Sequence, residues 1–239
     1  MTAGITLEIR EKRYAGGNGH VAVTAIKDLR AHILPNEFCA LFGPSGCGKS
    51  TLLNIIAGID RSFSGSVRFD CGHTPRIGYV FQIPRLLPWR TVRENVTLVL
   101  PRSVDPGTVD GLLREVGLAE VASFYPARLS GGMARRAALA RAFAIEPDLL
   151  LLDEPFVSLD AAAADRLRAL LLRLVAARPA TVLFVSHDAA EAVALADRIL
   201  LLSSAPGRVV AEMPIRIPRE KRGDPNTVAK LSAELARFE

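Results

Sequence analysis

Residues 43–50 read Gly-Pro-Ser-Gly-Cys-Gly-Lys-Ser and match the pattern G-x-x-x-x-G-K-[ST] at every fixed position. Glycines let backbone N–H groups turn inward toward a phosphate, and a helix starting near Lys49 would point its positive dipole end at the same anion. Lys49 would reach the β- and γ-phosphates of a nucleotide, and the Ser50 hydroxyl would be a Mg²⁺ ligand. The segment predicts a phosphate-binding loop, whose contact residues would be Gly43, Pro44, Ser45, Gly46, Cys47, Gly48, Lys49, Ser50 and Thr51.

Two neighbouring carboxylates, Asp153 and Glu154, follow four consecutive leucines at residues 149–152. A fully apolar run of this length is typical of a buried parallel strand, which would hold both acids at its end. There Asp153 can hold Mg²⁺ or its water, and Glu154 can polarise an attacking water as a general base. The pattern also fits a core strand that simply ends at the surface, but beside a phosphate loop it predicts phosphate hydrolysis.

An α/β scaffold is needed to position these residues. The apolar runs 38–42 and 181–185 are expected to be buried strands, and residues 49–57 and 160–177 have helical periodicity. Strands alternating with helices predict an α/β fold with a largely parallel sheet. Several prolines and short helical patterns predict a mostly helical insertion at residues 82–147.

Composition excludes several other classes of protein. The 239 residues suit one domain with an inserted subdomain, and the apolar stretches are too short to span a bilayer. The three cysteines lack the paired spacing of a zinc or disulfide site, and the first ten residues lack the apolar core of a secretory signal. The apolar pattern of the chain therefore predicts a cytosolic location. The net charge of +5 is spread along the chain, so we expect no nucleic-acid partner.

The tetrapeptide Leu-Ser-Gly-Gly at residues 129–132 opens another predicted helix, whose N-terminus suits an anionic phosphate. With this motif the sequence strongly resembles the nucleotide-binding subunits of ABC proteins, whose defining signature is LSGG. The resemblance covers about residues 5–218, and its landmarks follow the family's order: Tyr14, the phosphate loop, Gln82, LSGG, Asp153-Glu154, Ser158-Leu159-Asp160 and His187.

The resemblance implies a P-loop NTPase fold, with a RecA-like core, an N-terminal antiparallel β subdomain and an inserted α-helical subdomain. Residues 1–239 would form a single ABC ATPase domain, in which 82–147 is the helical subdomain and 216–239 a C-terminal tail. Its ligands would be ATP and Mg²⁺. Water would attack the γ-phosphate in line, and hydrolysis would drive transmembrane transport.

The same resemblance implies roles for individual residues. Tyr14 would stack on adenine, or be merely an aromatic at a strand end. Gln82 would contact Mg²⁺ and the attacking water, so Glu154, His187 and Gln82 are the catalytic candidates and Ser50, Gln82 and Asp153 the candidate metal ligands.

A second copy of the chain is also implied, arranged head to tail. Ser130, Gly131 and Gly132 would bind the γ-phosphate held by the other copy. Asp160 would belong to the loop that crosses this interface, or act as a simple helix cap. The residues after the signature, Met133, Ala134 and Arg135, depart from the glutamine-rich sequence that is common in the family, with an effect on rate or coupling that the sequence does not give.

One segment of the sequence indicates which branch of the family the chain resembles. Residues 86–96, Leu-Leu-Pro-Trp-Arg-Thr-Val-Arg-Glu-Asn-Val, look like the LLPW-x-TV-x-x-NV stretch of importers for nitrate, sulfonate, taurine and related solutes, and so does the Ala-Pro-Gly-Arg at 205–208. Trp89 would either dock a membrane helix or pack in the core.

An importer ATPase would work with integral membrane permease subunits and, indirectly, with a solute-binding protein. It would lie at the cytoplasmic face of the inner membrane as a peripheral subunit. The alternatives are an ABC exporter ATPase, a soluble ABC ATPase of DNA repair or translation, and a small-molecule P-loop kinase, which would lack LSGG and His187. The transported solute cannot be read from this subunit.

Overall fold

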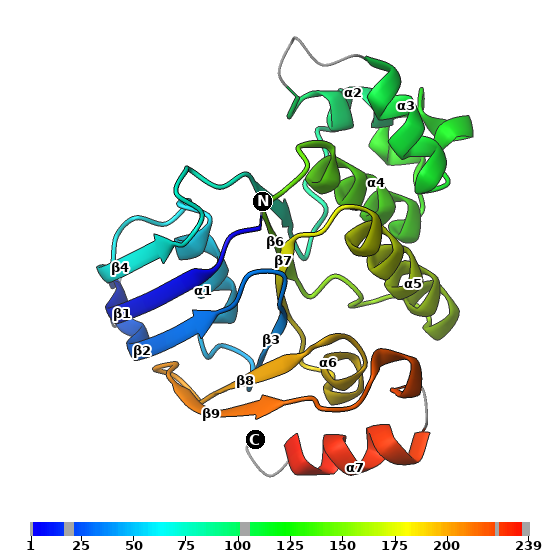
Figure 1. The fold of residues 1–239 in the computed structure, drawn as a ribbon. Coiled ribbons are helices and arrows are strands. Elements are labelled where there is room, and N and C mark those ends of the chain that lie inside the picture. Colours follow the sequence, from blue (N-terminus) through cyan, green and yellow to red (C-terminus); the bar gives the residue numbers. More distant parts are fainter. Residues whose placement is uncertain (1, 17–21, 101–105, 223–224, 236–239) are drawn as a thin grey trace. The chain divides into compact units, whose positions relative to one another are not determined.

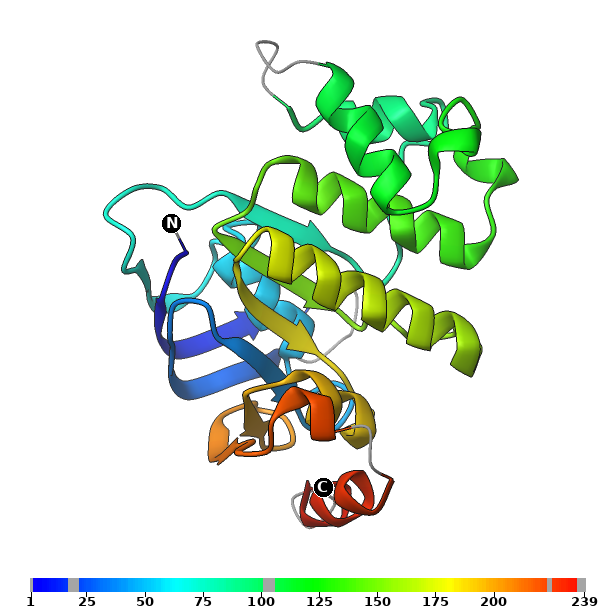
Figure 2. The same ribbon diagram turned by 45° about the vertical axis from the view of Figure 1, so that its right-hand side comes forward.

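The computed structural model describes residues 2–16, 22–100, 106–222 and 225–235, which form two compact units. The first unit comprises Met1–Thr74 and Thr181–Glu239, and the second comprises Pro75–Ala180 (Figures 1 and 2). Parts of the predicted insertion, 101–105, and of the predicted tail, 223–224 and 236–239, lie outside the described residues. The bounds 82–147 and 216–239 therefore remain proposals.

The first unit contains an antiparallel sheet of β1 (Ile5–Tyr14), β2 (Val23–Ile33) and β4 (Ser64–Phe69), in the order β2-β1-β4 (Figure 1). The first six residues of β1 alternate between apolar and polar side chains, and the strand continues for four more residues to Tyr14. These last four residues are mostly charged, and the buried Lys12 ammonium among them is paired with Asp60 at 2.7 Å. Because the buried ammonium is paired with a carboxylate, this charged end of β1 can be part of the sheet.

Parallel strands of the same unit carry the phosphate loop. β3 (Phe38–Phe42) pairs in parallel with β7 (Thr181–Val185) and β8 (Arg198–Leu202), and β9 (Val209–Pro214) pairs antiparallel with β8. Every residue of β3 and β7 is buried, which confirms the strands expected at 38–42 and 181–185. The helices of this unit are α1 (Lys49–Ile56), α6 (Ala189–Leu195), η3 (Arg219–Lys221) and α7 (Pro225–Leu235).

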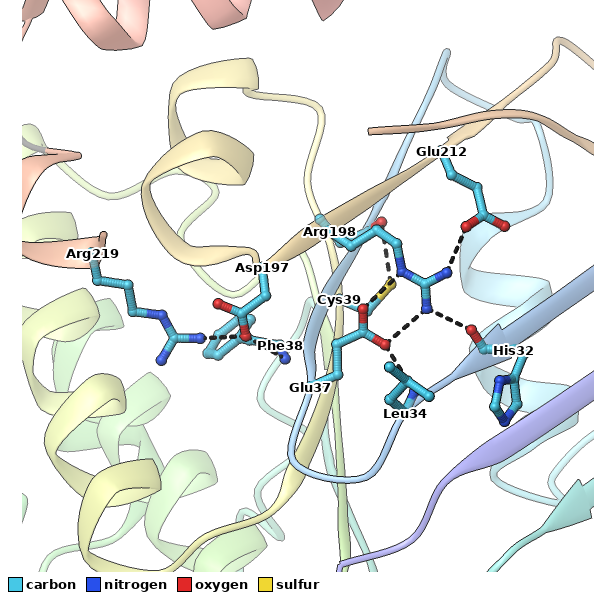
Figure 3. Close-up of polar contacts among 10 residues, drawn as sticks. His32, Leu34, Glu37, Phe38, Cys39, Asp197, Arg198, Glu212 and Arg219 are labelled. Atoms are coloured by element: carbon cyan, nitrogen blue, oxygen red, sulfur yellow. Dashed lines mark hydrogen bonds and ion pairs between the residues drawn. The ribbon is translucent and has the colours of Figure 1, made fainter. Parts of the chain in front are cut away.

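A polar network fixes the beginnings of β3 and β8 (Figure 3). The Arg198 guanidinium donates to both carboxylate oxygens of Glu37, at 2.7 and 2.8 Å, and to Glu212 at 2.5 Å. Next to it, Asp197 accepts from the Phe38 N–H at 3.0 Å and from Arg219 at 2.9 Å. The network ties β3, β8, β9 and the segment before α7 together at the end of the strands opposite the phosphate loop.

The second unit is built on two parallel strands, β5 (Ile77–Val80) and β6 (Leu149–Asp153), with Val80 opposite Leu152. The buried Asp148 accepts from the Arg76 N–H at 2.8 Å and fixes this register. The described residues between the two strands form helices: α2 (Val92–Thr97), α3 (Pro106–Glu115), η1 (Ala119–Val121), η2 (Pro126–Arg128) and α4 (Gly131–Ala144).

Helix α5 (Ala161–Ala177) follows β6, and α4 and α5 are neighbours in both views (Figures 1 and 2). Leu167, Leu170, Leu171 and Leu174 are buried on one face of α5, as the periodicity predicted. Among the described residues, helices of sufficient length and hydropathy to cross a bilayer are absent.

Candidate functional site

The phosphate loop turns sharply between β3 and α1. Gly43, Gly46 and Gly48 have φ angles of 154°, 80° and 95°, a region that side chains with a Cβ rarely adopt. Gly48 is the N-cap of α1, and the first turn of that helix contains no acidic residue. The positive end of the helix is therefore left for an external anion, as the motif predicted.

Lys49 is only 6% exposed, and its ammonium is held by the loop itself. It donates to the carbonyl oxygens of Gly43 at 2.6 Å and Pro44 at 2.8 Å. The Cys47 sulfur lies 3.7 Å away, and Cys47 is 1% exposed. An ammonium placed among two carbonyls is ready to exchange them for phosphate oxygens, which are stronger acceptors.

Tyr14 lies at the end of β1, close to the first turn of α1. Its ring is 44% exposed, and its hydroxyl is 3.1 Å from the Thr51 Oγ1. The Lys12 ammonium lies 4.4 Å from the ring centroid. The Tyr14 hydroxyl is therefore held by Thr51 and one face of the ring by the Lys12 ammonium, while the rest of the side chain stays exposed.

His187 extends from the same edge of the first unit as the phosphate loop. β7 and β3 run in parallel with Val185 opposite Leu41, so the chain leaves both strands at one edge. The turn is fixed by the Ser186 hydroxyl, which donates to Glu191 at 2.6 Å, and by Asp188, which caps α6. His187 itself is exposed.

In the second unit, Gln82 and the predicted carboxylate pair come together. The Gln82 Nε2 donates to the Glu154 Oε2 at 3.2 Å, across 72 residues of sequence. Asp153 ends β6 behind four fully buried leucines and is itself 7% exposed. The Asp153 carboxylate reinforces the effect of burial in raising the pKa of Tyr79 on the neighbouring strand.

Glu154 has a φ of 46°, in the left-handed region. For a residue with a Cβ, this conformation costs of order 1–3 kcal/mol and persists only where its surroundings hold it. The fully buried leucines of β6 supply that restraint on one side, and Gln82 holds the carboxylate on the other. A strained acid that is held in one position at a strand end fits a side chain whose carboxylate must point in a fixed direction.

The LSGG segment caps α4. The Ser130 hydroxyl accepts from the Met133 N–H at 3.2 Å, and the first turn of α4 has no acidic residue. A Cβ added to Gly132 would meet nothing within 4 Å, so the surface above it is open. Ser130, Gly131 and Gly132 line a cavity of about 830 Å³ within the second unit, together with Asp160, Arg114, Arg136, Arg166 and Arg173.

Asp160 is the N-cap of α5 and accepts from the Ala163 N–H at 2.8 Å. The helix-cap alternative is therefore present in the structure, whatever Asp160 does in a dimer. Two residues that follow the signature also make internal bonds: Arg135 donates to the Val157 carbonyl and Arg136 to the Val116 carbonyl. Sequence reasoning gave neither bond, because each joins segments about 20 residues apart.

Trp89 is 68% exposed, so the core-packing alternative for this residue is wrong. The loop that carries it is held by Asn95, which is fully buried. The Asn95 amide donates to the carbonyls of Leu87, Arg90 and Thr91 and accepts from the Leu87 N–H at 2.7 Å. The buried amide thus displays the indole on the surface, beside the start of α2.

The predicted site residues form two groups. Tyr14, the phosphate loop at 43–51 and His187 belong to the first unit. Gln82, the LSGG segment, Asp153, Glu154 and Asp160 belong to the second. The phosphate loop, His187, Gln82 and the carboxylate pair lie at or just after the ends of parallel strands, LSGG and Asp160 lie at helix starts, and Tyr14 ends the antiparallel strand β1.

Comparisons with known proteins agree with these features. The family described as "ABC transporter" matches residues 26–157. The chain is 46% identical over 241 residues to the "Aliphatic sulfonates import ATP-binding protein SsuB 2" of Burkholderia lata, covering 98% of this chain and 86% of that protein. A protein of the same name from Pseudomonas syringae pv. tomato is 43% identical over 230 residues, which is 95% of both chains.

Solved structures give the same fold. The dimeric structure of MJ0796, "a Bacterial ABC Transporter Cassette", has a TM-score of 0.77 and 30% identity, covering 90% of this chain and all 100% of that chain. A post-hydrolysis state of MJ0796 bound to ADP and Pi has a TM-score of 0.75 and 28% identity over 90% of this chain and 100% of that one. The predicted P-loop NTPase fold is confirmed. The family match, the relatives above 40% identity and the LSGG helix agree: the chain belongs to the ABC transporter family, as one of its ATP-binding cassettes.

Proposed function

We propose that the chain hydrolyses ATP as a subunit of an importer for a small organic anion, with an aliphatic sulfonate as the first candidate. Two observations carry the ATPase proposal. The phosphate loop holds the buried Lys49 beside the N-terminus of α1, whose first turn has no acidic residue. In the second unit, Gln82 donates a hydrogen bond to the strained Glu154. The names of the relatives, which are import ATP-binding proteins for aliphatic sulfonates, support the direction and the solute class.

Different side chains of the chain would carry out nucleotide binding and the steps of hydrolysis. Backbone N–H groups of the loop and the Lys49 ammonium bind the β- and γ-phosphates, and the Tyr14 ring stacks on the adenine. Glu154 accepts a proton from water as the water oxygen attacks the γ-phosphorus, and Gln82 keeps the carboxylate aimed. The bond from the γ-phosphorus to the bridging oxygen breaks and leaves ADP and phosphate. His187 steadies the γ-phosphate.

Mg²⁺ fits the residues that are present. Its preferred ligands are oxygens, and the candidate set consists of the Ser50 hydroxyl, the Asp153 carboxylate and the Gln82 amide oxygen. The buried Asp153 at the end of β6 is an anion held in place by its strand. When bound, the ion would neutralise charge on the β- and γ-phosphates.

A second copy of the chain would complete the site. The N-terminus of the LSGG helix lines the cavity, with Ser130 as its N-cap and Gly131 and Gly132 in its first turn. Backbone N–H groups of this turn would bind a γ-phosphate held by the partner. Asp160 would lie in the loop that crosses the dimer interface. The dimeric state of the MJ0796 cassette supports this arrangement.

The membrane partner would be a permease that docks beside α2. Trp89, Leu98 and Tyr125 are all at least half exposed there, and large exposed apolar side chains mark interaction surfaces. A solute-binding protein would deliver the solute to that permease. The chain would then act at the cytoplasmic face of the inner membrane as a peripheral subunit.

Transport in reconstituted vesicles tests this proposal. The chain, the permease that copurifies with it and a solute-binding protein are assembled in vesicles, and uptake of labelled ethanesulfonate, taurine and nitrate is measured. We expect sulfonate uptake that requires ATP on the cassette side and falls at least about 100-fold with Lys49→Ala, because the γ-phosphate loses its cation.

Trp89→Ala should retain the ATPase activity of the isolated chain but lose copurification with the permease and most of the uptake. The matched control is Val210→Ala, which removes a 45% exposed side chain from the first unit. ATP-dependent movement in the outward direction would instead identify an exporter, and unchanged copurification with Trp89→Ala would contradict the docking surface.

A further inference from the structure

The loop between β8 and β9 contains the Ala-Pro-Gly-Arg sequence at 205–208, to which the ATPase mechanism gives no role. The Ser203 hydroxyl organises this loop. It donates to the Pro206 carbonyl at 3.1 Å and accepts from the Arg208 N–H at 3.2 Å, and the Ser203 N–H donates to the Arg208 carbonyl at 3.0 Å. These bonds hold the backbone of Gly207 between them.

Gly207 is buried against β2. Its N–H donates to the Ala25 carbonyl at 2.9 Å, and its own carbonyl accepts from the Lys27 N–H at 3.2 Å. Ala25 is the extra residue of a bulge, since Thr24 pairs with Arg13 while Ile26 pairs with Lys12. Bulges re-aim backbone groups next to functional sites, and this one turns the Ala25 carbonyl toward the glycine.

The other side of Gly207 faces the phosphate loop. A Cβ built on Gly207 would lie 2.0 Å from the Cys47 carbonyl oxygen, far inside any allowed contact. Two loop glycines are similarly close to their support: a Cβ on Gly43 would lie 2.7 Å from the Leu202 carbonyl, and one on Gly48 would lie 2.9 Å from the Ala25 carbonyl. The loop therefore rests, backbone on backbone, on β2 and on the segment from Leu202 to Gly207.

We propose that Gly207 is a positioning residue for nucleotide binding. By presenting only a hydrogen atom to the Cys47 carbonyl, it lets the phosphate loop adopt the curvature in which its N–H groups point at the phosphates. The proposal rests on the proposed binding of ATP by this loop. It also gives the 205–208 sequence a function in the site, at a distance of about 160 residues along the chain from the loop it supports.

A methyl group at position 207 would overlap the Cys47 carbonyl, so either the phosphate loop or the loop of Gly207 must move, whereas the Ala25 carbonyl, at 3.5 Å, is at an ordinary contact distance. The backbone of Gly207 is held by its bonds to the Ala25 carbonyl and the Lys27 N–H, and its loop is held by Ser203. The Cys47 N–H donates to the Pro44 carbonyl at a long 3.4 Å, so the backbone at Cys47 is held less tightly than the backbone at Gly207. The phosphate loop is therefore the part that gives way.

The test compares Gly207→Ala with Gly111→Ala. Gly111 lies in α3, where an added Cβ meets nothing within 4 Å, so the same chemical change there adds no contact. For each variant we would measure the dissociation constants for ATP and ADP, the KM and kcat for hydrolysis, and the melting temperature. Gly207→Ala should weaken both nucleotides and raise KM by about tenfold, with a smaller change in kcat and in the melting temperature.

Ser203→Ala provides a second variant, should Gly207→Ala fail to fold. It removes the bonds that hold the supporting loop and adds no atom near Cys47. A two- to fourfold rise in KM is expected, about a third of the effect of Gly207→Ala. Wild-type ATP affinity in both variants, or an equal loss in Gly111→Ala, would overturn the proposal.

A lower melting temperature with an unchanged KM in Gly207→Ala would also overturn it, because that result is the mark of a purely structural glycine. The wild-type chain separates this proposal from the one on which it rests. If the wild type itself binds no ATP, the proposed function fails, whereas normal binding by the wild type and by Gly207→Ala refutes only the role of Gly207.

Discussion

At the scale of single residues, the side chains that would do chemistry are held by protein partners, two of which are far away in the sequence. The Tyr14 hydroxyl lies on Thr51, and the Gln82 amide lies on Glu154. Lys49 is held by the carbonyls of its own loop until phosphate oxygens replace them. Restraint of this kind lowers the entropy that each side chain loses when ATP binds.

Tyr14→Ala should weaken ATP binding by about tenfold, because a stacked aromatic ring is worth of order 1–3 kcal/mol to a base. Tyr14→Phe keeps the ring and loses the hydroxyl with its contacts to Thr51 and Asp60, so its affinity should stay within about threefold of wild type. Titration calorimetry of the two variants measures the difference. An equal loss in both would mean that the hydroxyl, and not the ring, binds the nucleotide.

Residues inside motifs could be predicted from the sequence, but their supports could not. Lys49, Glu154 and Ser130 are recognisable because a fixed spacing carries their chemistry. Lys12 was not, since its partner Asp60 lies 48 residues away and a single sequence does not show which charges meet. Gly207 is a similar case, because the need for a glycine arises only from a carbonyl that the fold brings against it.

At the scale of elements, apolar periodicity predicted the strands that carry the site. β3, β6 and β7 coincide with runs that are buried throughout, so burial alone determines them. Ends that depend on polar contacts were less predictable. Within the predicted helical insertion, α2 (Val92–Thr97) is short: its capping box at Thr91 fixes the start, while its apolar pattern continues into a turn.

Arg198→Met should lower the free energy of unfolding by about 3 kcal/mol, because it leaves the carboxylate of Glu37, whose side chain is 9% exposed, without its partner. The control is Arg168→Met in α5, which breaks an ion pair with Asp165, whose side chain is 70% exposed, and should cost less than about 0.5 kcal/mol. Urea denaturation gives both values. Equal values for the two variants would show that the network of Figure 3 does not hold β3 and β8 together.

At the scale of the whole molecule, each compact unit carries one part of the proposed chemistry. In the proposed mechanism the first would bind phosphate and adenine, and the second would supply the carboxylates and the LSGG helix. The sequence predicted both parts through ordered motifs. The need for a second copy came from the family resemblance, because no periodicity or spacing within one chain indicates a partner.

The most direct test of the account is the mass of Glu154→Gln in solution, measured by light scattering with and without ATP. The amide removes the general base but can still accept the bond from Gln82, so the variant should bind ATP without hydrolysing it. We expect its mass to double when ATP is added and the doubling to disappear with Lys49→Ala in addition. Hydrolysis at the wild-type rate, or a mass that ATP leaves unchanged although it is bound, would contradict the account.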